Sequence, residues 1–459
     1  MGILIVRLRW LSMLGALIAF SGAAYASGAI KAGAGRCVIT PEQSMWMAGY
    51  ASRKSPSEGK VHDLWAKALA FEDETGARSV VLTTDLVGIP AALAHQTAAL
   101  VQENLRIPRE RLMITSSHTH CGPVTRDILY DMYGLEGGQA KLVADYTAGL
   151  PEKFVKAIQE AIESLEPCTL SYGIGEAGFG KNRRQYTVDG IANGFNPIGP
   201  VDHDVPALVA RRADGSVKAV LFGYACHNTT LSFQQFCGDY AGFAQIDVEA
   251  ALPGAVGLFV SGCGADQNPL PRGKVEQAMQ YGRELAGAVL GVVNRKGIDV
   301  RGPLRCAYKE IPLALSPAPT REQVEARAKS DNVFEQRLAI RLLQTLDEKG
   351  GLDTIYPYPV QVWQFADSLQ LTALAGEVVV DYSHRLKYEL GRERQFIIAY
   401  ANDVCAYIPS LRILKEGGYE GAGAMVYYGF YGPWAPTVED DIVRTVLELS
   451  RADDRSSGD

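Results

Sequence analysis

Two of the chain's seven histidines stand one residue apart in Ser117-His118-Thr119-His120-Cys121-Gly122-Pro123. Side chains two residues apart in an extended segment point to the same side, so His118 and His120 could bind one metal ion. A plain polar loop explains the pair equally well. The Gly-Pro that follows favours a turn, which would fold this segment over a site.

Two other residues that suit a metal ion follow apolar runs. His227 ends the strand pattern that begins at Val217, although a single histidine there is more often a satisfied core residue. Glu377 follows Leu371–Gly376, where a carboxylate is costly to bury unless it is paired or bound to a cation. Glu377 could instead cap a helix beginning at Val378, because negative charge is favourable at a helix N-terminus.

Two histidines, one carboxylate and one further oxygen ligand form a reasonable set for Zn²⁺. Imidazole and carboxylate suit this borderline metal, and an open position leaves room for water. Composition and spacing alone predict an α/β protein with a candidate metal site, and no more than that.

The elements that must position these residues alternate between strands and helices. The predicted strands are Ser79–Thr84, Arg111–Thr115, Val217–Ala225, Ala255–Val260, Arg301–Leu313, Gln361–Phe365, Leu369–Leu374 and Phe396–Ala399. The predicted helices are Pro90–Leu105, Val143–Leu165, Gly238–Leu252, Val275–Val293, Thr320–Lys349, Val378–Leu390 and Glu439–Leu449. Strand ends carry His118, His227, Gly264 and Glu377, so a layered α/β fold could bring them together.

The first residues predict export. Arg7 and Arg9 precede an apolar run from Trp10 to Ala23, and Ala24-Tyr25-Ala26 has the small-x-small pattern of a cleavage site. We therefore expect a signal peptide over residues 1–26 and a secreted or periplasmic protein. An uncleaved N-terminal anchor is the alternative, although the run of roughly 14 residues is shorter than the about 20 that span a bilayer.

The whole chain has the composition of a globular protein, with 47% hydrophobic and 21% charged residues. We expect one catalytic domain over residues 27–450 and a disordered tail over 451–459. A net charge of −7 without a Lys/Arg run argues against nucleic-acid binding. None of the eight cysteines forms a CxxC pattern, which argues against a cysteine zinc cluster. In an oxidising compartment we expect small buried cysteines with one or two disulfides among them.

At these residues the sequence resembles the neutral/alkaline (non-lysosomal) ceramidase family. The segments that carry the resemblance follow the family's order along nearly the whole mature chain. They are Gly33–Arg36, Ile39–Pro41, Met47–Tyr50, Val61–Asp63, Ala66–Ala68, Ser117–Pro123, Asn182-Arg183, Ala225–His227, Gly238–Gly242, Ala375–Glu377, Asn402–Tyr407 and Gly418–Ala422.

The resemblance implies a mixed α/β fold, a layered sandwich with two β-sheets between helices. It also implies one zinc ion, with His120 either supporting the metal ligands or polarising the substrate, and with Arg183 lining the pocket. The implied zinc ligands are His118, His227, Glu377 and Tyr407. The implied substrate is a lipid or other small molecule with a ceramide-like N-acyl amide bond. Peripheral contact of the protein with a membrane is compatible with such a substrate. No obligate protein partner is indicated.

Two departures from the family limit these implications. Its members usually carry a C-terminal β-sandwich domain, for which we find no segment after the last predicted helix. The family's nucleophilic serine lies in Gly-Asp-Val-Ser-Pro-Asn, and the matching stretch Gly264–Pro269 has Gln267 where the serine would be. Since glutamine is no nucleophile, we expect attack by a metal-activated water. His120 or Asp266 would take its proton, and Gln267 would stabilise the oxyanion.

Other interpretations stay open. Asp266 could attack covalently, or catalysis could be lost, although an inactive site has no reason to keep four ligands. The enzyme could be an esterase, deacylase or lactone hydrolase acting on a small or carbohydrate-linked substrate, because a fold does not fix a substrate. The aromatic residues of Tyr427–Trp434 would then stack on a sugar, unless they are core. A non-catalytic, zinc-containing binding protein of the cell envelope is a further interpretation.

Overall fold

The computed structural model describes residues 2 and 30–451. The predicted signal peptide and C-terminal tail, apart from Gly2 and Arg451, lie outside the described residues, and both stay predictions. No helix among the described residues is both long and apolar enough to span a membrane.

Three sheets form the body of the molecule, and each is built from the same succession of elements. Three antiparallel strands are followed by a helix and by a fourth strand that runs parallel to the third. The first sheet contains β1 (Lys31–Val38), β3 (Trp65–Glu72), β4 (Arg78–Thr84) and β5 (Leu112–Ser116), with α1 (Ala91–Leu105) before β5. The second contains β7 (Thr169–Glu176), β11 (Asp204–Arg211), β12 (Val217–Tyr224) and β14 (Val256–Ser261), with α4 (Asp239–Ala251) before β14. The third contains β17 (Leu304–Ala314), β18 (Ile355–Phe365), β19 (Leu369–Leu374) and β21 (Gln395–Ile398), with α8 (Val380–Leu390) before β21.

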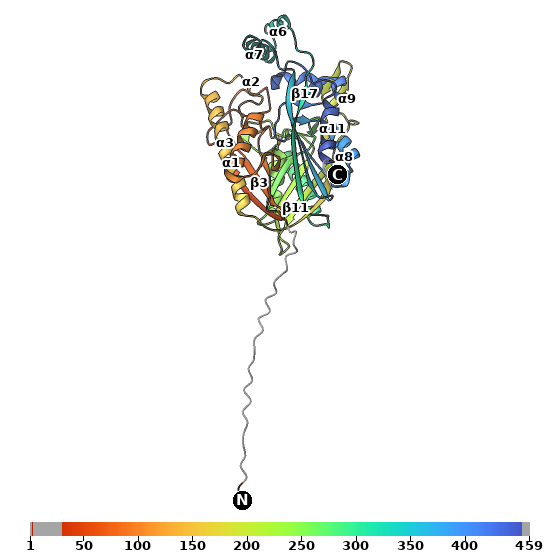
Figure 1. Cartoon of the computed structure of the whole chain (residues 1–459). Coiled ribbons are helices and arrows are strands. Elements are labelled where there is room, and N and C mark those ends of the chain that lie inside the picture. The colour runs from red at the N-terminus through yellow and green to blue at the C-terminus, as the bar shows by residue number, and fades with distance from the viewer. Residues whose placement is uncertain (1, 3–29, 452–459) are drawn as a thin grey trace.

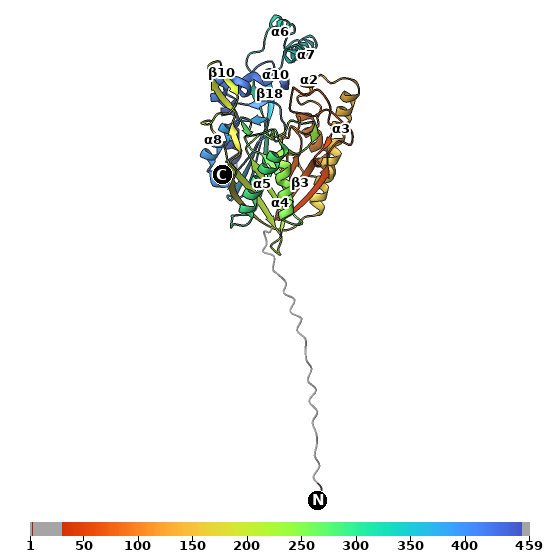
Figure 2. The ribbon, with the colours of Figure 1, turned by 180° about the vertical axis from the view of Figure 1, so that it is seen from behind.

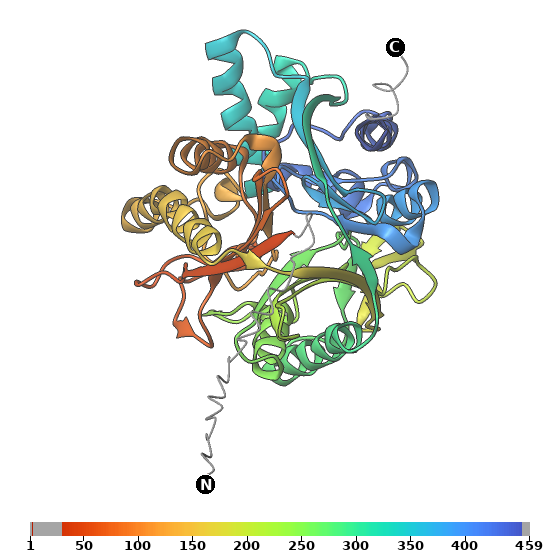
Figure 3. The ribbon, with the colours of Figure 1, turned by 60° about the horizontal axis from the view of Figure 1, so that its bottom comes forward.

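A second helix follows the fourth strand of each sheet. These helices are α3 (Gly137–Glu163), α5 (Val275–Val293) and α11 (Val438–Ser450). They pack against the first two strands of their own sheets, and the helices lie on the outer sides of the sheets, as Figure 3 shows. Figure 1 shows α1 and α3 beside β3, and Figure 2 shows α4 and α5 on the opposite side of the molecule.

The inner faces of the three sheets enclose one hydrophobic cluster. Phe71 of the first sheet, Leu221 of the second and Leu371 of the third belong to it. Phe71 and Phe365 are in edge-to-face contact, with ring centroids 5.4 Å apart. The sheets therefore depend on one another for burial of their inner faces.

The segments that connect the main strands and helices contain shorter elements. The strand pairs are β2 (Gly59–Lys60) with β13 (Gln235–Phe236), β8 (Gly180–Asn182) with β15 (Gln267–Pro269), β9 (Arg184–Thr187) with β10 (Gly190–Asn193), and β20 (Glu377–Val378) with β22 (Tyr407–Ile408). Edge strands of the first and second sheets are β6 (Glu166–Pro167) and β16 (Ile298–Val300). The remaining helices are α2 (Tyr130–Tyr133), α6 (Arg321–Arg327), α7 (Val333–Lys349), α9 (Leu411–Glu416), α10 (Met425–Tyr428) and the π-helix Tyr419–Gly423, with 3₁₀ turns at Arg109–Arg111 and Arg392–Arg394.

The predicted mixed α/β fold, with sheets between helices, is confirmed, and a third sheet joins the two that were expected. Two local expectations were wrong. The helical stretch Thr320–Lys349 is divided, because the Asn332 side chain accepts hydrogen bonds from the N–H groups of Phe334 and Glu335 and starts a new helix, α7. The expected disulfides are absent, since all eight cysteines are free thiols.

β1 packs so closely on α3 that the position of Gly35 has no room for a side chain, and this can be tested. A Cβ atom at this position would overlap the backbone of Ala157 and Ala161 in α3. We expect Gly35→Ala to destabilise the protein by about 1–3 kcal/mol through overpacking, seen as a lower thermal unfolding midpoint. Gly149→Ala, within α3 but facing open space, is the matched control and should raise stability by about 0.5–1 kcal/mol. Equal effects of the two substitutions would contradict the close contact.

Candidate metal centre

The C-terminal ends of the fourth strands meet at one place in the interior. The Ala399 N–H donates to the Ser261 carbonyl (2.8 Å), and the Ser116 N–H donates to the Tyr400 carbonyl (3.2 Å). The Ser261 hydroxyl donates to the Ser117 carbonyl (3.0 Å). These bonds join the three sheets and satisfy polar groups that the strand ends would otherwise leave unpaired.

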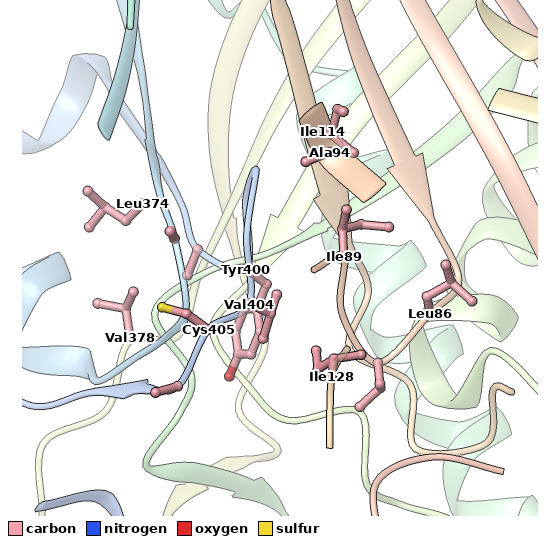
Figure 4. Packing of buried hydrophobic residues seen from close by; sticks show 14 of the residues in the cluster. Leu86, Ile89, Ala94, Ile114, Ile128, Leu374, Val378, Tyr400, Val404 and Cys405 are labelled. Carbon is pink, nitrogen blue, oxygen red and sulfur yellow. The ribbon is translucent and has the colours of Figure 1, made fainter. Parts of the chain in front are cut away.

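Loops that leave the third strands supply two of the functional groups at this meeting place, and loops after the fourth strands supply His118, His120 and Tyr407. His227 is the third residue after β12, and Glu377 is the third residue after β19. The equivalent residue after β4 is Val87, whose carbonyl bonds His118 Nδ1. Figure 4 shows the loop after β21 packed between the loops that follow β4 and β19, and its labelled residues include Leu86, Val378, Tyr400 and Val404.

Backbone strain is concentrated around the same place. His118, Tyr400 and Asn402 have φ angles of 59°, 53° and 64°, in the left-handed region that non-glycine residues rarely adopt. Gly376, directly before Glu377, has a φ of 73°. Strained residues of this kind persist where the surrounding structure fixes them, and they cluster at functional sites.

Two of the histidines have a defined tautomer. His118 Nδ1 bonds the Val87 carbonyl, and His227 Nδ1 bonds the Gly264 carbonyl at 2.9 Å. A carbonyl oxygen can only accept, so Nδ1 carries the proton in both residues and each Nε2 presents a lone pair. Histidines that bind metals are commonly oriented by this kind of second hydrogen bond.

His120 completes a cluster of three imidazoles. Its Nε2 lies 3.1 Å from His118 Nε2, and the ligand nitrogens of His118, His120 and His227 all lie within 4.8 Å of one another. The Tyr50 ring contacts His120 edge-on with centroids 4.9 Å apart, and Gly49 leaves space that a Cβ atom would take from the imidazole. Unlike the other two, His120 has no hydrogen-bond partner for Nδ1 in the described part of the chain.

The Glu377 carboxylate faces these nitrogens. Its Oε2 lies 3.2 Å from His118 Nε2 and 3.0 Å from His227 Nε2, while Oε1 accepts a hydrogen bond from the Tyr428 hydroxyl. Within the described residues, no donor bonds Oε2. A buried carboxylate oxygen beside imidazole lone pairs is repulsive unless a cation lies among them. These nitrogen and oxygen donors therefore fit a divalent metal ion, and they suit Zn²⁺.

Burial and mutual electrostatics favour the protonation states that a metal ion requires. Burial, assisted by the positive charge of Arg183, lowers the pKa of His227 to about 4. Burial and the neighbouring His118 hold the pKa of His120 well below its usual value. Burial raises the pKa of Glu377, but a positive charge on His118 and His227 outweighs it and leaves that pKa well below the usual range, so a cation among these nitrogens keeps the carboxylate ionised. Neutral imidazoles and an ionised carboxylate are the forms that bind metals.

Tyr407 lies at the edge of this cluster. Its hydroxyl oxygen is 3.2 Å from His227 Nε2 and accepts a hydrogen bond of 2.9 Å from Arg183 Nη2. Trp434 Nε1 donates to the Tyr407 carbonyl (2.8 Å) and fixes the backbone. Burial raises the pKa of Tyr407 well above its usual value, and only a nearby cation, such as Arg183 or a metal ion, would oppose this. The structure thus brings Tyr407 and Arg183 to the predicted site.

Arg183 is itself held by a buried ion-pair network. Its Nε donates to Glu420 Oε1 (2.8 Å), and Arg184 Nη1 donates to Glu420 Oε2 (2.6 Å). A second carboxylate, Glu416, pairs with Arg184 at 3.0 Å. Buried charges are tolerated when they are paired in this way, so Glu420 fixes the guanidinium that contacts Tyr407.

Asp266 and Gln267 are buried nearby, but their side chains bond other groups. Asp266 Oδ1 accepts from the Val380 N–H (2.9 Å) at the start of α8, and burial raises the pKa of Asp266 to about 7. Gln267 Oε1 accepts from the Asp202 N–H (3.1 Å), and its Nε2 donates to the Cys263 carbonyl (3.4 Å). Their catalytic roles stay predictions.

Sequence reasoning missed Asn268 and the role of Tyr428. Asn268 Oδ1 accepts from Arg183 Nη1 (3.3 Å) and from the Thr229 hydroxyl (3.4 Å). A signal for Asn268 was present, because Asp-Gln-Asn-Pro also aligns with the Asp-Val-Ser-Pro part of the family stretch. In that register Asn268, and not Gln267, occupies the serine position. Tyr428 was predicted only as stacking or core, yet it bonds Glu377.

Aromatic residues surround the centre on its more exposed side. Tyr419 and Tyr428 lie 5.2 Å and 6.2 Å from the Tyr407 ring, measured between centroids. Tyr427 contacts Tyr419 at 6.2 Å, and Tyr50 covers His120. We call Tyr50, Tyr419, Tyr427 and Tyr428 the tyrosine rim. All four are partly exposed, whereas the three histidines, Glu377 and Tyr407 are buried.

A family of known proteins matches the first part of this chain. The family described as "Neutral/alkaline non-lysosomal ceramidase, N-terminal" matches residues 31–263. That range contains the three histidines and Arg183, but it ends before Glu377 and Tyr407. Neutral ceramidase from Pseudomonas aeruginosa is 27% identical over 210 residues, which are 44% of this chain and 30% of that protein. The matched segment therefore spans less than a third of this curated relative.

Solved structures share the fold over a longer range. "Ceramidase complexed with C2" has a TM-score of 0.72 at 19% identity and covers 93% of this chain and 75% of that one. The crystal structure of neutral ceramidase from Pseudomonas aeruginosa has a TM-score of 0.71 at 20% identity, with 93% and 74% covered. At this identity the likeness establishes the fold, and it includes the part of the chain that the family match leaves out.

Metal binding is expected to depend on His227. The purified protein should contain about one divalent metal ion per chain. His227→Ala should lose it, because the substitution removes an oriented lone pair. Elemental analysis after dialysis measures this, with His95→Ala as the control, since His95 is an exposed histidine that pairs with Glu310. Stoichiometric metal in the His227 variant would refute the ligand assignment.

Proposed function

Because the chain belongs to the neutral/alkaline non-lysosomal ceramidase family, we propose that it is a zinc-dependent hydrolase of the N-acyl amide bond of a ceramide-like lipid. The observation that carries this proposal is the convergence of the His118 and His227 nitrogens on Glu377 Oε2, an oxygen that no donor bonds within the described residues. His120 completes the cluster, with its Nε2 3.1 Å from His118 Nε2.

The hydrogen bonds of the histidines suggest which of them bind the metal ion and which transfers a proton. Nδ1 of His118 and of His227 is anchored by a carbonyl, which is typical of metal ligands. His120 has no such anchor, so we assign it as the group that accepts and returns a proton. Glu377 and Tyr407 complete the proposed ligand set. A bound zinc ion would polarise the scissile carbonyl and lower the pKa of a water molecule to about 7.

The proposed reaction adds water across the amide bond. The water oxygen adds to the carbonyl carbon while His120 Nε2 takes one of its protons. The C–N bond then breaks, and the proton passes from His120 to the leaving amine. The products are a fatty acid and a free sphingoid-type amine, so the reaction balances with water as the one co-substrate and needs no oxidant.

A second candidate substrate is a smaller or more polar ester, lactone or amide. The observation that favours it is the tyrosine rim, whose partly exposed rings contact Tyr407 and His120. Tyrosine hydroxyls can bond a polar substrate, and the rings can stack on a sugar as readily as on a lipid chain.

Export is part of the proposal. A basic start, an apolar run and Ala24-Tyr25-Ala26 support cleavage after Ala26. When the full chain is expressed in a bacterial host, we expect a periplasmic or secreted protein that begins at Ser27. N-terminal sequencing of the fractionated protein tests this. An intact Met1 in the membrane fraction would favour the uncleaved anchor.

Chelator-sensitive release of fatty acid from a short-chain ceramide is the direct test. The zinc-loaded mature protein should release the acid, and prior chelation should abolish release because the carbonyl is no longer polarised. Re-addition of zinc should restore it. Release that resists complete metal removal would refute a metal-dependent mechanism. No release from the zinc-loaded protein would exclude ceramide and favour the smaller ester or amide substrates.

A further inference from the structure

Asn268 lies on β15 with its side chain opposite to that of Gln267. Side chains alternate along a strand, and the Gln267 side chain bonds Asp202 and Cys263. Asn268 therefore faces Arg183 and Thr229. The Gln267 carbonyl accepts a hydrogen bond from the His227 N–H (3.0 Å), so β15 is fixed directly against the loop that carries a proposed metal ligand.

The hydrogen bonds of Asn268 define the orientation of its carboxamide. Arg183 Nη1 can only donate, so the atom it contacts at 3.3 Å must be the carboxamide oxygen. The Thr229 hydroxyl approaches the same oxygen at 3.4 Å. Both bonds use the oxygen, and the NH₂ group has no hydrogen-bond acceptor among residues 30–451. Asn268 is only 3% exposed, so this free donor is nearly enclosed by protein.

The free donor is close to the metal centre. One guanidinium joins the two, because Arg183 Nη2 donates to the Tyr407 hydroxyl (2.9 Å), and that hydroxyl is 3.2 Å from His227 Nε2. Arg183 uses Nε for Glu420, Nη1 for Asn268 and Nη2 for Tyr407. The Gln267 carboxamide donates to the Cys263 carbonyl. Of the two neighbouring carboxamides, Gln267 and Asn268, Asn268 is therefore the one whose NH₂ group makes no hydrogen bond within the described residues.

We propose that Asn268 is a catalytic residue whose NH₂ group donates to the oxygen of the scissile carbonyl, and that it takes the place of the family's nucleophilic serine. This rests on the proposed function. When water adds to the carbonyl carbon, the oxygen gains negative charge, and a donor held in place by Arg183 and Thr229 stabilises that charge without reorganising. An amide cannot form the acyl-enzyme that a serine would form, so water attacks directly and the residue at this position contributes only a hydrogen bond.

The test compares zinc-loaded wild type with Asn268→Ala and Asn268→Asp. Losing one oxyanion donor costs a factor of about 10²–10³ in kcat. We expect both variants to lose about 10²-fold in kcat, with KM changed less than threefold and metal content unchanged by elemental analysis. The Asn268→Asp variant would keep the shape of the side chain and the pairing with Arg183, so it covers the case in which the alanine variant fails to fold. Asn294→Ala, at the exposed end of α5, should match the wild type.

A binding measurement separates this role from a structural one. A phosphonamidate analogue of the tetrahedral adduct places negative oxygens where the carbonyl oxygen would be. Calorimetry should show its affinity falling by about the same factor as kcat/KM in both variants, since such analogues report transition-state contacts. The affinity for the free amine product, which has no acyl oxygen for Asn268 to contact, should stay within threefold.

The outcomes distinguish this inference from the proposed function. An active wild type with unimpaired Asn268 variants, or with variants whose KM rises while kcat is unchanged, overturns the role of Asn268 alone. A wild type that binds zinc but hydrolyses no amide or ester overturns the proposed function and this inference with it. An acyl adduct on the wild-type chain, detected by intact mass after rapid quenching, would also overturn direct attack by water.

Discussion

A carboxylate buried beside histidine lone pairs is the constraint on which the rest of this structure depends. Glu377 Oε2 lies within 3.2 Å of Nε2 of His118 and His227, and both imidazoles are turned so that the opposite nitrogen bonds a carbonyl. Left without a cation, this arrangement repels itself in a medium of low dielectric constant. The surrounding hydrogen bonds nonetheless hold it in place, including the bond from Tyr428 to Glu377. This unfavourable arrangement of charge and lone pairs is expected where a metal ion completes the site.

The repeated sheet provides the means of assembling this centre. In each sheet a parallel pair follows an antiparallel hairpin, so the third and fourth strands end at the same edge, where parallel strands commonly present reactive groups. Packing three such sheets around one core brings these edges together. No single sheet carries the site, because His118, His227 and Glu377 come from the first, second and third sheets. Loss of packing between any two sheets would separate the ligands.

Much of this arrangement could be predicted from the sequence, and the limits have physical causes. The β-branched and apolar runs before His118, His227 and Glu377 revealed the strands that carry them. The strands β1, β3, β7 and β11 escaped notice because they are rich in glycine and alanine or interrupted by polar residues or proline, and they gain their stability from neighbours that are distant in sequence. The position of Asn268 escaped because an offset of one residue moves a side chain to the opposite face of a strand. The ring orientation of His120 depends on Gly49 and Tyr50, which lie far from it in the sequence.

The proposed mechanism separates two parts of hydrolysis, polarisation of the carbonyl and attack on its carbon, which the family's motif combines. Polarising the carbonyl would require the proposed metal ligands and Arg183, and these side chains meet in this structure. Attack on the carbonyl carbon requires a nucleophile, and in the register proposed above the serine position is occupied by a carboxamide whose oxygen is fixed by Arg183 and Thr229. Exchanging a hydroxyl for an amide removes the nucleophile but keeps a polar group of similar size at the same place. An activated water can supply the attack, since a polarised carbonyl does not require that the nucleophile belong to the protein. Retention of the ligands together with loss of the serine is therefore consistent with a changed mechanism on the same fold.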